Sequence, residues 1–390
     1  MIDLDANATT QPDPAVIEAM LPFLTQHYGN PSAAHAAGRR ARRAVDAARQ
    51  QVAVLIGAEP QEIVFTSGAT ESISSVHLSA YQTGREHPLL IISAVEHAAT
   101  QACAERWKAQ GGRVKIIPVF PNGLVNLEAL ESALEPGKTA LVSLLWANNE
   151  TGVVQPMAEV VSMAHAAGAL VHADAVQMGG KLPVDVRKVG MDYLSMSGHK
   201  MHGPKGIGIL FVNRHAPFHP LIIGGGQEYE RRSGTENVPG IVAMGKAAEL
   251  AQQHVQSPES QTSMARLRDH LEQMLQEALP EIVIHGREVL RLPNTSSVYF
   301  PGVDAAGLII RLDQKGIACS GGSACHSASL HPSHVLEAMG YDARHAGSTV
   351  RFSLSRLTTN SEVEKAGGEI IAAVHHLRAQ WDPEVVVTMA

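Results

Sequence analysis

The sequence has 390 residues, which is long enough for two or three domains of the usual size. Hydrophobic residues make up 45% of the chain and charged residues 18%, and this balance excludes a mostly disordered protein. The formal net charge of −7 argues against a nucleic-acid partner, because non-specific nucleic-acid binders are usually basic.

The first ten residues, MIDLDANATT, have no basic region followed by an apolar core, so we expect no signal peptide. No apolar run approaches the length of a membrane span, so we expect no membrane partner either. The three cysteines, Cys103, Cys319 and Cys325, are an odd number and too few for a disulfide framework. These features favour a reduced, cytoplasmic setting.

Two helices are predicted near the start of the chain. Asp13 and Pro14 suit the beginning of the first, and its apolar face is Val16, Ile17, Met20, Leu21 and Leu24. The second runs from about Arg39 to Ile56 and ends at Gly57. Its arginines at 39, 40, 42 and 43 are interpreted as a solvated face.

Between residues 62 and 212, short apolar runs alternate with helical patterns. The expected strands are 63–66, 88–93, 114–119, 140–146, 170–174, 193–197 and 207–212. Several are apolar throughout, which is typical of strands buried on both faces of a parallel or mixed α/β sheet. We therefore predict a large α/β domain with a mostly parallel sheet.

After a helix near 238–255, the polar stretch QSPESQ is interpreted as a linker. A further helix and shorter strands at 282–285, 296–300 and 350–355 then predict a smaller α+β domain. The predicted division is a large domain of residues 14–255 and a small domain of residues 1–13 and 256–390.

Several predicted strands end in polar residues suited to one ligand. The strand at 63–66 leads through small residues into a helix beginning near Ala69 and Thr70, which favours a phosphate site, although an ordinary helix cap explains it equally simply. Asp174 ends another strand, where ligands of open α/β sheets bind, or else it caps a loop. Lys200 follows a third and is either a Schiff-base lysine or a surface lysine.

Two more strands lead to Asn149 and His97, either of which could contact a ligand or be a satisfied polar residue. Taken together, these polar residues at the ends of the predicted strands indicate a particular ligand more specifically than any one of them does alone. Pyridoxal phosphate needs a lysine, an acid beside its ring nitrogen and a phosphate site, so this cofactor is the hypothesis that explains the set.

In the second half, Cys325 lies in a Gly/Ser-rich stretch, which favours a nucleophilic thiol over core packing. Cys319 follows apolar residues and is expected to pack inside. Arg351 begins a strand and could bind a carboxylate or form an ion pair between domains. The histidines at 326, 331, 334 and 345 match no common metal site by their spacing.

At this point the chain resembles the pyridoxal-phosphate-dependent cysteine desulfurases of the NifS/IscS type, within the class V aminotransferases. The motifs that carry the resemblance are LDANATT, GNPSAAH, EIVFTSGATES, VEH, WANNETG, HADAVQ, SGHKMHGPKGIG, RRSGTEN, GSACHS and VRFSLSR. They span nearly the whole sequence, and WANNETG, HADAVQ and RLPNTSSV look closest to the nitrogen-fixation branch.

The resemblance implies a type I pyridoxal-phosphate-dependent transferase fold, a homodimer, L-cysteine as substrate and an iron–sulfur scaffold protein as sulfur acceptor. It implies that Lys200 binds the cofactor, that His97 stacks on its ring and moves protons, and that Cys325 carries the persulfide and makes a transient iron–sulfur contact. Arg351 and Asn149 are implied substrate contacts. The implied cofactor contacts are Ala69, Thr70, Asn149, Asp174, Gln177, Ser197, Gly198, His199, Lys200 and, from the partner subunit's copy, Thr235.

Some residues depart from the family pattern, notably the stretch ISSVHLSA after the phosphate motif, His326 and His331. They bear on partner docking rather than on cofactor chemistry. Three alternatives stay open: an aminotransferase or a selenocysteine lyase of the same fold, and a catalytically silent docking subunit, which would be expected to lack the lysine, the aspartate or the cysteine.

Overall fold

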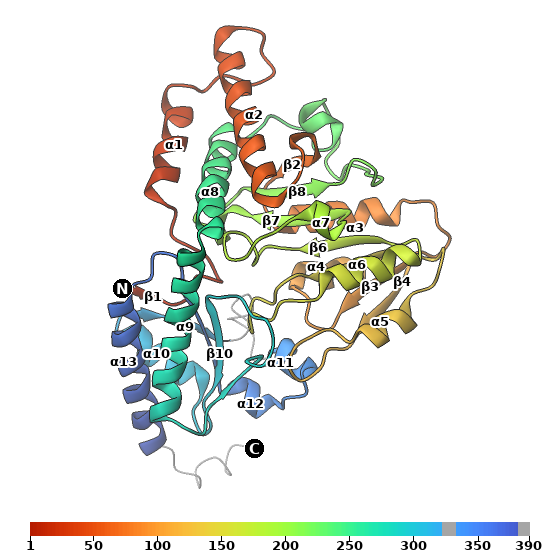
Figure 1. Cartoon of the computed structure of the whole chain (residues 1–390). Helices are drawn as coiled ribbons and strands as arrows, with labels where there is room; N and C mark the ends of the chain where they lie inside the picture. The colour runs from red at the N-terminus through yellow and green to blue at the C-terminus, as the bar shows by residue number, and fades with distance from the viewer. Residues whose placement is uncertain (322–332, 381–390) are drawn as a thin grey trace.

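The computed structural model describes residues 1–321 and 333–380 of the chain. They form a seven-stranded sheet covered by helices, a smaller four-stranded sheet and a two-stranded pair (Figure 1). Cys325, the predicted nucleophile, lies outside the described residues.

The large sheet is mostly parallel, as predicted. Its strands, in spatial order, are β2 (Ile63–Thr66), β8 (Gly208–Val212), β7 (Tyr193–Ser197), β6 (Leu170–Asp174), β5 (Thr139–Leu145), β3 (Leu89–Ser93) and β4 (Arg113–Ile117). Only β8 runs against its neighbours in this sheet. The strands predicted from apolar runs agree with these bounds to within two residues.

Helices cover both faces of this sheet, which explains why most of its strands are buried along their whole length, whereas the edge strand β4 is partly exposed. One face packs on α3 (Ala69–Tyr81) and α4 (Ala98–Ala109). The other packs on α2 (Ala36–Ile56), α5 (Leu127–Ala133), α6 (Met157–Ala166) and α8 (Val238–Gln256), and the short α7 (Val186–Val189) adds to the same core.

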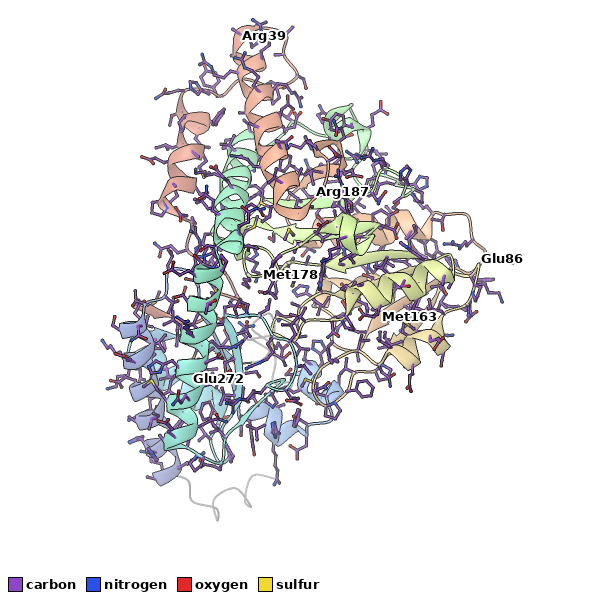
Figure 2. The ribbon with its side chains drawn as sticks, viewed as in Figure 1. Arg39, Glu86, Met163, Met178, Arg187 and Glu272 are labelled. Atoms are coloured by element: carbon purple, nitrogen blue, oxygen red, sulfur yellow. The ribbon has the colours of Figure 1, made fainter. Side chains whose placement is uncertain are left out.

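Helix α2 confirms its predicted stripe and its end. Its apolar residues are buried in the core, and Gly57 ends it with a left-handed φ of 69°. The helix begins three residues earlier than predicted, because the side chain of His35 accepts a hydrogen bond from the N–H of Gly38. Arg39 lies in solvent at the outer end of α2, in agreement with the prediction of a solvated basic face (Figure 2).

The apolar face predicted for the first helix, α1 (Pro14–Thr25), is mostly wrong. Val16 is buried against α8, but Ile17, Leu21 and Leu24 are 48%, 52% and 58% exposed. The reason is that α1 contacts the rest of the chain mainly through α8, along one narrow line of side chains. Its cap is as predicted, because Asp13 accepts from the N–H of Ala15.

The small sheet is antiparallel and has its own core. Its strands, in order, are β12 (Ser320–Gly321), β13 (Thr349–Ser353), β10 (Thr295–Tyr299) and β9 (Val283–Ile284), and nearby β1 (Ile2–Asp3) pairs in parallel with β11 (Ile317–Ala318). Around it lie α9 (Pro258–Ala278), α10 (Ala305–Gln314), α11 (His334–Ala338), α12 (Ala343–Gly347) and α13 (Asn360–Ala379). Cys319 is buried in this core, as predicted.

The linker predicted at QSPESQ is wrong. Helix α8 ends at Gln256 and α9 begins at Pro258, so Ser257 alone joins them and caps α9 with its side chain (Figure 1). A serine followed by proline is a strong helix start as well as a loop signal, and the helix prevails here. The domain boundaries at residues 14 and 256 stay a proposal, which the two separate cores support.

A buried ion pair holds the segment that leads to Thr235. The guanidinium of Arg49, on α2, donates to both carboxylate oxygens of Glu228 at 2.7 Å, and both side chains are 3% exposed. The rings of Phe65 and Tyr229 lie 4.9 and 5.3 Å from the guanidinium. Glu228 and the two residues after it have positive φ angles, a costly conformation for non-glycine residues that this pair helps to stabilise.

Arg49→Met should therefore destabilise the protein strongly. It leaves the carboxylate of Glu228 buried without its cation, which typically costs about 3–5 kcal/mol. Urea unfolding measures the change, and Arg43→Met on the exposed face of the same helix is the matched control, with an expected effect within about 0.5 kcal/mol. Equal effects of the two variants would contradict the importance of the pair.

Candidate functional site

Polar residues gather where the parallel strands of the large sheet end. Leu145 on β5 pairs with Asp174 on β6, and Asp174 pairs with Ser195 on β7, so the segments that follow these strands start side by side. This edge of the sheet is where open α/β folds bind ligands. The structure thus brings Asn149, Asp174 and Lys200 to one edge.

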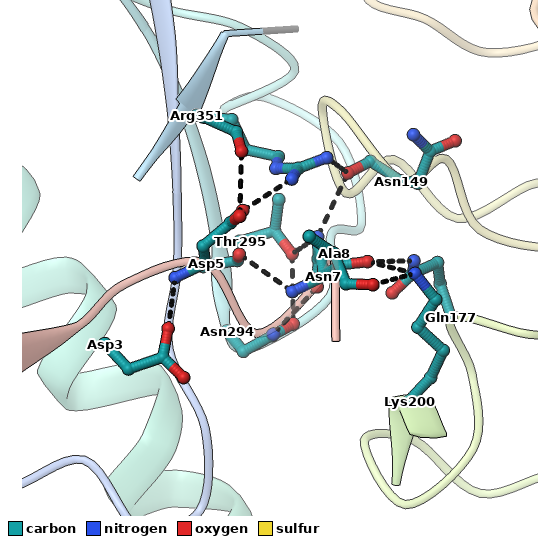
Figure 3. A network of polar contacts seen from close by, with 12 residues as sticks. Asp3, Asp5, Asn7, Ala8, Asn149, Gln177, Lys200, Asn294, Thr295 and Arg351 are labelled. Carbon is teal, nitrogen blue, oxygen red and sulfur yellow. Dashed lines mark hydrogen bonds and ion pairs between the residues drawn. The ribbon is translucent and has the colours of Figure 1, made fainter. Parts of the chain in front are cut away.

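Lys200 lies in a single 3-10 turn, Gly198–Lys200, directly after β7. Its amine donates hydrogen bonds to the backbone oxygens of Asn7 and Ala8, at 2.6 and 2.7 Å (Figure 3). The side chain therefore points into the space between the large sheet and the N-terminal segment. This position excludes the alternative interpretation of Lys200 as a surface lysine.

Asp174 is 3% exposed at the end of β6. Burial raises the pKa of its carboxyl, while His97 and Lys200 lie close enough to lower the same pKa. One carboxylate oxygen also accepts from the N–H of Val176, at 3.0 Å. Asp174 therefore both caps its own turn and contributes a negative charge beside Lys200.

His97 begins α4 and caps it, since its Nδ1 accepts from the N–H of Ala99 at 3.1 Å. The ring is half-buried and lies near Asp174. The cap fixes which ring nitrogen carries a proton, because Nδ1 must be the acceptor. A neutral His97 therefore has its N–H at Nε2.

The start of α3 is built to receive an anion. Gly68 provides no side-chain cap, and within the described residues the N–H groups of Ala69 and Thr70 have no hydrogen-bond acceptor. A side chain on Gly208 would meet the backbone of Gly68 at 2.7 Å, so glycine is required where β8 passes this turn. Such free N–H groups at a helix start bind phosphate well.

Ser197 and His199 lie beside this turn. The Ser197 hydroxyl is 3.9 Å from where a side chain on Gly68 would begin, and His199 contacts the hydroxyl of Thr9 at 3.2 Å through Nδ1. Burial, together with Lys200 and Lys205, lowers the pKa of His199 to about 4. A neutral His199 can still donate one hydrogen bond to a phosphate oxygen.

Arg351 lies on β13 and joins the two parts of the chain. It is 1% exposed, donates to the backbone oxygen of Asn149 at 3.0 Å and forms an ion pair with Asp5 at 2.7 Å (Figure 3). Both residues belong to the predicted small domain, so this is not the ion pair between domains that was the alternative. The Nε of Arg351 is buried with no acceptor among the described residues, so the guanidinium retains a donor for a ligand.

Two predicted site residues are not brought into this group. Thr235 is exposed on the segment after Glu228, and the structure shows no contact from it to Lys200 or Asp174. Cys325 lies outside the described residues. Their predicted roles stay predictions.

Asn7 is the residue that the sequence analysis missed. Its side chain donates to Thr295 and to the backbone oxygen of Asn149, and its Oδ1 accepts from Asn294 and Lys181. Its backbone oxygen accepts from Lys200 and from Gln177. Each of its partners is more than 100 residues away in sequence, so only its place in the LDANATT motif could have drawn attention to it.

Two buried glutamates were also missed. Burial, with Asp174 nearby, raises the pKa of Glu96 to about 8, and its carboxylate accepts from Ser93 and from the N–H of Leu145. Burial raises the pKa of Glu150 to about 7, although a 2.5 Å hydrogen bond from Ser333 and the nearby Arg351 oppose the rise. Both directly adjoin predicted site residues, His97 and Asn149.

Among residues 1–321 and 333–380, no cluster of three or more histidine, cysteine, aspartate or glutamate side chains is arranged to hold a metal ion. Of the histidines considered for a metal, His345 instead contacts the ring of His285 at 2.8 Å. The helices of the described ranges also include none with the length and apolar character of a membrane span.

Glu150 should make stability pH-dependent. The pKa of Glu150 in the folded protein, about 7, exceeds the usual 4.5. Its contribution to the free energy of unfolding is therefore fully present below pH 4.5 and is lost as the pH rises through about 7. Glu150→Gln should remove this loss, so that relative to the wild type it gains on the order of 3 kcal/mol between pH 4.5 and 8. Urea unfolding across this range measures the difference.

The exposed Glu159→Gln is the control, because it removes one negative charge without burial. A Glu150→Gln difference that does not vary with pH would contradict a buried, protonated carboxyl at this position.

Comparison with known proteins identifies the family. The profile described as "Aminotransferase class-V" matches residues 2–366. A Sinorhizobium fredii protein named "Cysteine desulfurase" is 46% identical over 380 residues, which cover 97% of each chain.

Solved structures agree. A structure titled "NIFS-LIKE PROTEIN" is 38% identical, covers 96% of this chain and 99% of its own, and has a TM-score of 0.89. One titled "SspA in complex with cysteine" is 33% identical, with 92% and 100% coverage and a TM-score of 0.81. The predicted type I fold and NifS-type resemblance are confirmed, and the chain belongs to the aminotransferase class-V family.

Proposed function

We propose that this chain is a cysteine desulfurase, which converts L-cysteine to L-alanine and transfers the sulfur to Cys325. The observation that carries the proposal is the meeting of Lys200, Asp174 and the uncapped start of α3 at one edge of the sheet. The relatives named cysteine desulfurase and the related structure with bound cysteine support the substrate.

The residues at this edge fit pyridoxal phosphate. The free N–H groups of Ala69 and Thr70, with Ser197, Gly198 and His199, suit its phosphate, and Thr235 of a second copy is proposed to complete that site. When bound, the cofactor supplies an electron-withdrawing ring that stabilises negative charge on the substrate's Cα.

The other contacts to the cofactor follow from side-chain chemistry. Asp174 is a buried carboxyl that suits the ring nitrogen, because a negative charge there favours its protonated form. We propose that Gln177 donates from its amide to the phenolic oxygen, that Asn149 lies beside the cofactor, and that the half-buried ring of His97 stacks on it.

Proton transfer is assigned to Lys200 and His97. The Lys200 amine, once it is not bonded to the cofactor, takes the proton from the substrate's Cα, which suits a lysine held between backbone oxygens. His97, with its N–H at Nε2, is proposed to exchange protons near the substrate thiol. Arg351 binds the substrate carboxylate through its guanidinium, whose planar N–H groups can form two parallel hydrogen bonds to a carboxylate.

The sulfur transfer is assigned to Cys325. Its thiolate attacks the substrate's sulfur, so an S–S bond forms while the C–S bond breaks, and the electron pair of the broken bond remains with the substrate's Cβ. That carbon takes up a proton, Lys200 returns its proton to Cα, and the product is alanine. The persulfide is then delivered to an iron–sulfur scaffold protein, which would bring Cys325 transiently near an iron–sulfur cluster.

A homodimer and a cytoplasmic location belong to the same proposal. The exposed apolar side chains of α1, at Ile17, Leu21 and Leu24, are a surface that a second copy would cover. The exposed position of Thr235 is what a residue acting in a neighbouring subunit needs. Three cysteines, with no disulfide among those described, suit a reducing compartment.

Lys200→Ala should abolish the visible absorption band typical of lysine-bound pyridoxal phosphate. The variant lacks the only amine proposed to bond the cofactor, whereas Lys188→Ala, on the exposed side of α7, should keep the band. Absorption spectra after incubation with pyridoxal phosphate measure this, and an unchanged spectrum of Lys200→Ala would reject the assignment.

Cys325→Ala should still bind cofactor and L-cysteine but lose turnover by at least about 1,000-fold, because the sulfur has no acceptor. The control is Cys103→Ala on α4, with expected wild-type rates. Alanine and sulfide are assayed, and mass spectrometry locates the persulfide. Alanine formation at the wild-type rate without Cys325 would refute its role. Formation of 3-mercaptopyruvate with an added keto acid would favour an aminotransferase, and activity on selenocysteine alone would favour a selenocysteine lyase.

A further inference from the structure

Lys181 is a buried lysine that the chemistry above does not use. It is 5% exposed and lies in the turn after β6, just past Gly179 and Gly180. Its amine donates to Oε1 of Gln177 at 2.5 Å and to Oδ1 of Asn7 at 3.0 Å. Burying a lysine is costly, so its position next to the site needs a reason.

Ion pairing does not provide that reason. Within the described ranges, Lys181 has no carboxylate at ion-pair distance, and its charged neighbours Lys200 and Arg351 have the same sign. His202 also lies close to it. Burial lowers the pKa of Lys181 well below its usual range, and these positive neighbours add to the decrease. What the residue retains in every protonation state is at least two N–H donors.

Those donors and the backbone oxygen of Asn7 together determine how the amide of Gln177 is turned. The carbonyl of Asn7 can only accept, so the amide nitrogen faces it and the amide oxygen faces the donors of Lys181. The Nε2 of Gln177 therefore faces the opposite way, where it donates to the backbone oxygen of Asn7 at 3.1 Å. The same oxygen accepts from Lys200, and among the described residues the second N–H of Gln177 has no partner.

We propose that Lys181 is a positioning residue, which holds the amide of Gln177 with its N–H groups turned toward Lys200 and the cofactor site. The inference rests on the proposed function, in which Gln177 faces the phenolic oxygen of pyridoxal phosphate. Without Lys181, the amide oxygen loses its donor and only the hydrogen bond to Asn7 still orients the amide, so the N–H that stabilises the ionised phenolic oxygen is held less firmly.

The test is a pH titration of the visible absorption of the protein loaded with pyridoxal phosphate. Lys181→Met removes the donors and shortens the side chain by one heavy atom, so it still fills most of the space beside the cavity of about 20 Å³ that Lys181 and Lys200 line. The midpoint of the titration should rise by about one pH unit. Lys188→Met, an exposed lysine on α7, should leave the midpoint unchanged.

A double-mutant cycle separates positioning from charge. Gln177→Ala should raise the midpoint by a similar amount, and Lys181→Met should add nothing in the Gln177→Ala background. Lys181→Arg, which retains donors, should restore the wild-type midpoint. Additive shifts would overturn the proposal, since Lys181 would then act by its charge, and so would an unchanged midpoint in Lys181→Met.

Two further outcomes are separable. If Lys181→Met does not fold, as judged by circular dichroism, the same cycle is run with Lys181→Leu and is decided by the same criterion. A wild-type protein that gains no visible band with pyridoxal phosphate would refute the proposed cofactor site. If the wild-type protein gains a normal visible band but its pH midpoint is the same in the Lys181 variants, only the role of Lys181 is refuted.

Discussion

The site depends on residues 4–10, which form hydrogen bonds to both parts of the chain. The N–H groups of Leu4 and Ala6 donate to Ala318 and to Ser353 of the small core. A few residues later, the backbone oxygens of Asn7 and Ala8 accept from Lys200 of the large sheet. The segment therefore fixes the distance between Lys200 on one side and Arg351 of β13 on the other.

This arrangement also determines which buried charged groups near Asn7 are paired and which are not. Lys200, Lys181 and Arg351 place three basic groups around Asn7, while Asp174, Glu96 and Glu150 lie on the strands and loops beside them. Backbone and amide oxygens take most of the basic donors, so the carboxyls are not all neutralised by pairing. Burial then raises their pKa values, and the site retains groups able to hold or release protons near neutral pH.

Much of this arrangement could be predicted from the sequence, because the large sheet is buried on both faces and its strands are continuous apolar runs. Asp174, Asn149 and Lys200 each follow such a run, so sheet topology alone brings them together. Helix α1 was misjudged because amphipathic spacing shows which face is apolar and does not show what covers it.

The other features that the sequence analysis predicted wrongly or did not predict have a common cause. QSPESQ contains loop-forming residues, but Ser257 and Pro258 also start a helix, and packing against the small core favours the helix. Asn7 and Lys181 were missed because their roles arise from contacts between distant segments. A short polar segment and a lysine after two glycines have no local pattern that distinguishes them from ordinary turns.

The N-terminal segment also constrains the order in which the protein can be assembled. Asn7 is synthesised well before Ser353, to which its N–H donates across 346 positions of sequence. The large sheet can therefore collapse during synthesis while its lysine still lacks the carbonyls that hold it. The backbone oxygens that hold Lys200 are therefore fixed only after Ser353 has been translated, so a nascent chain that binds the cofactor before that point would have an incomplete site.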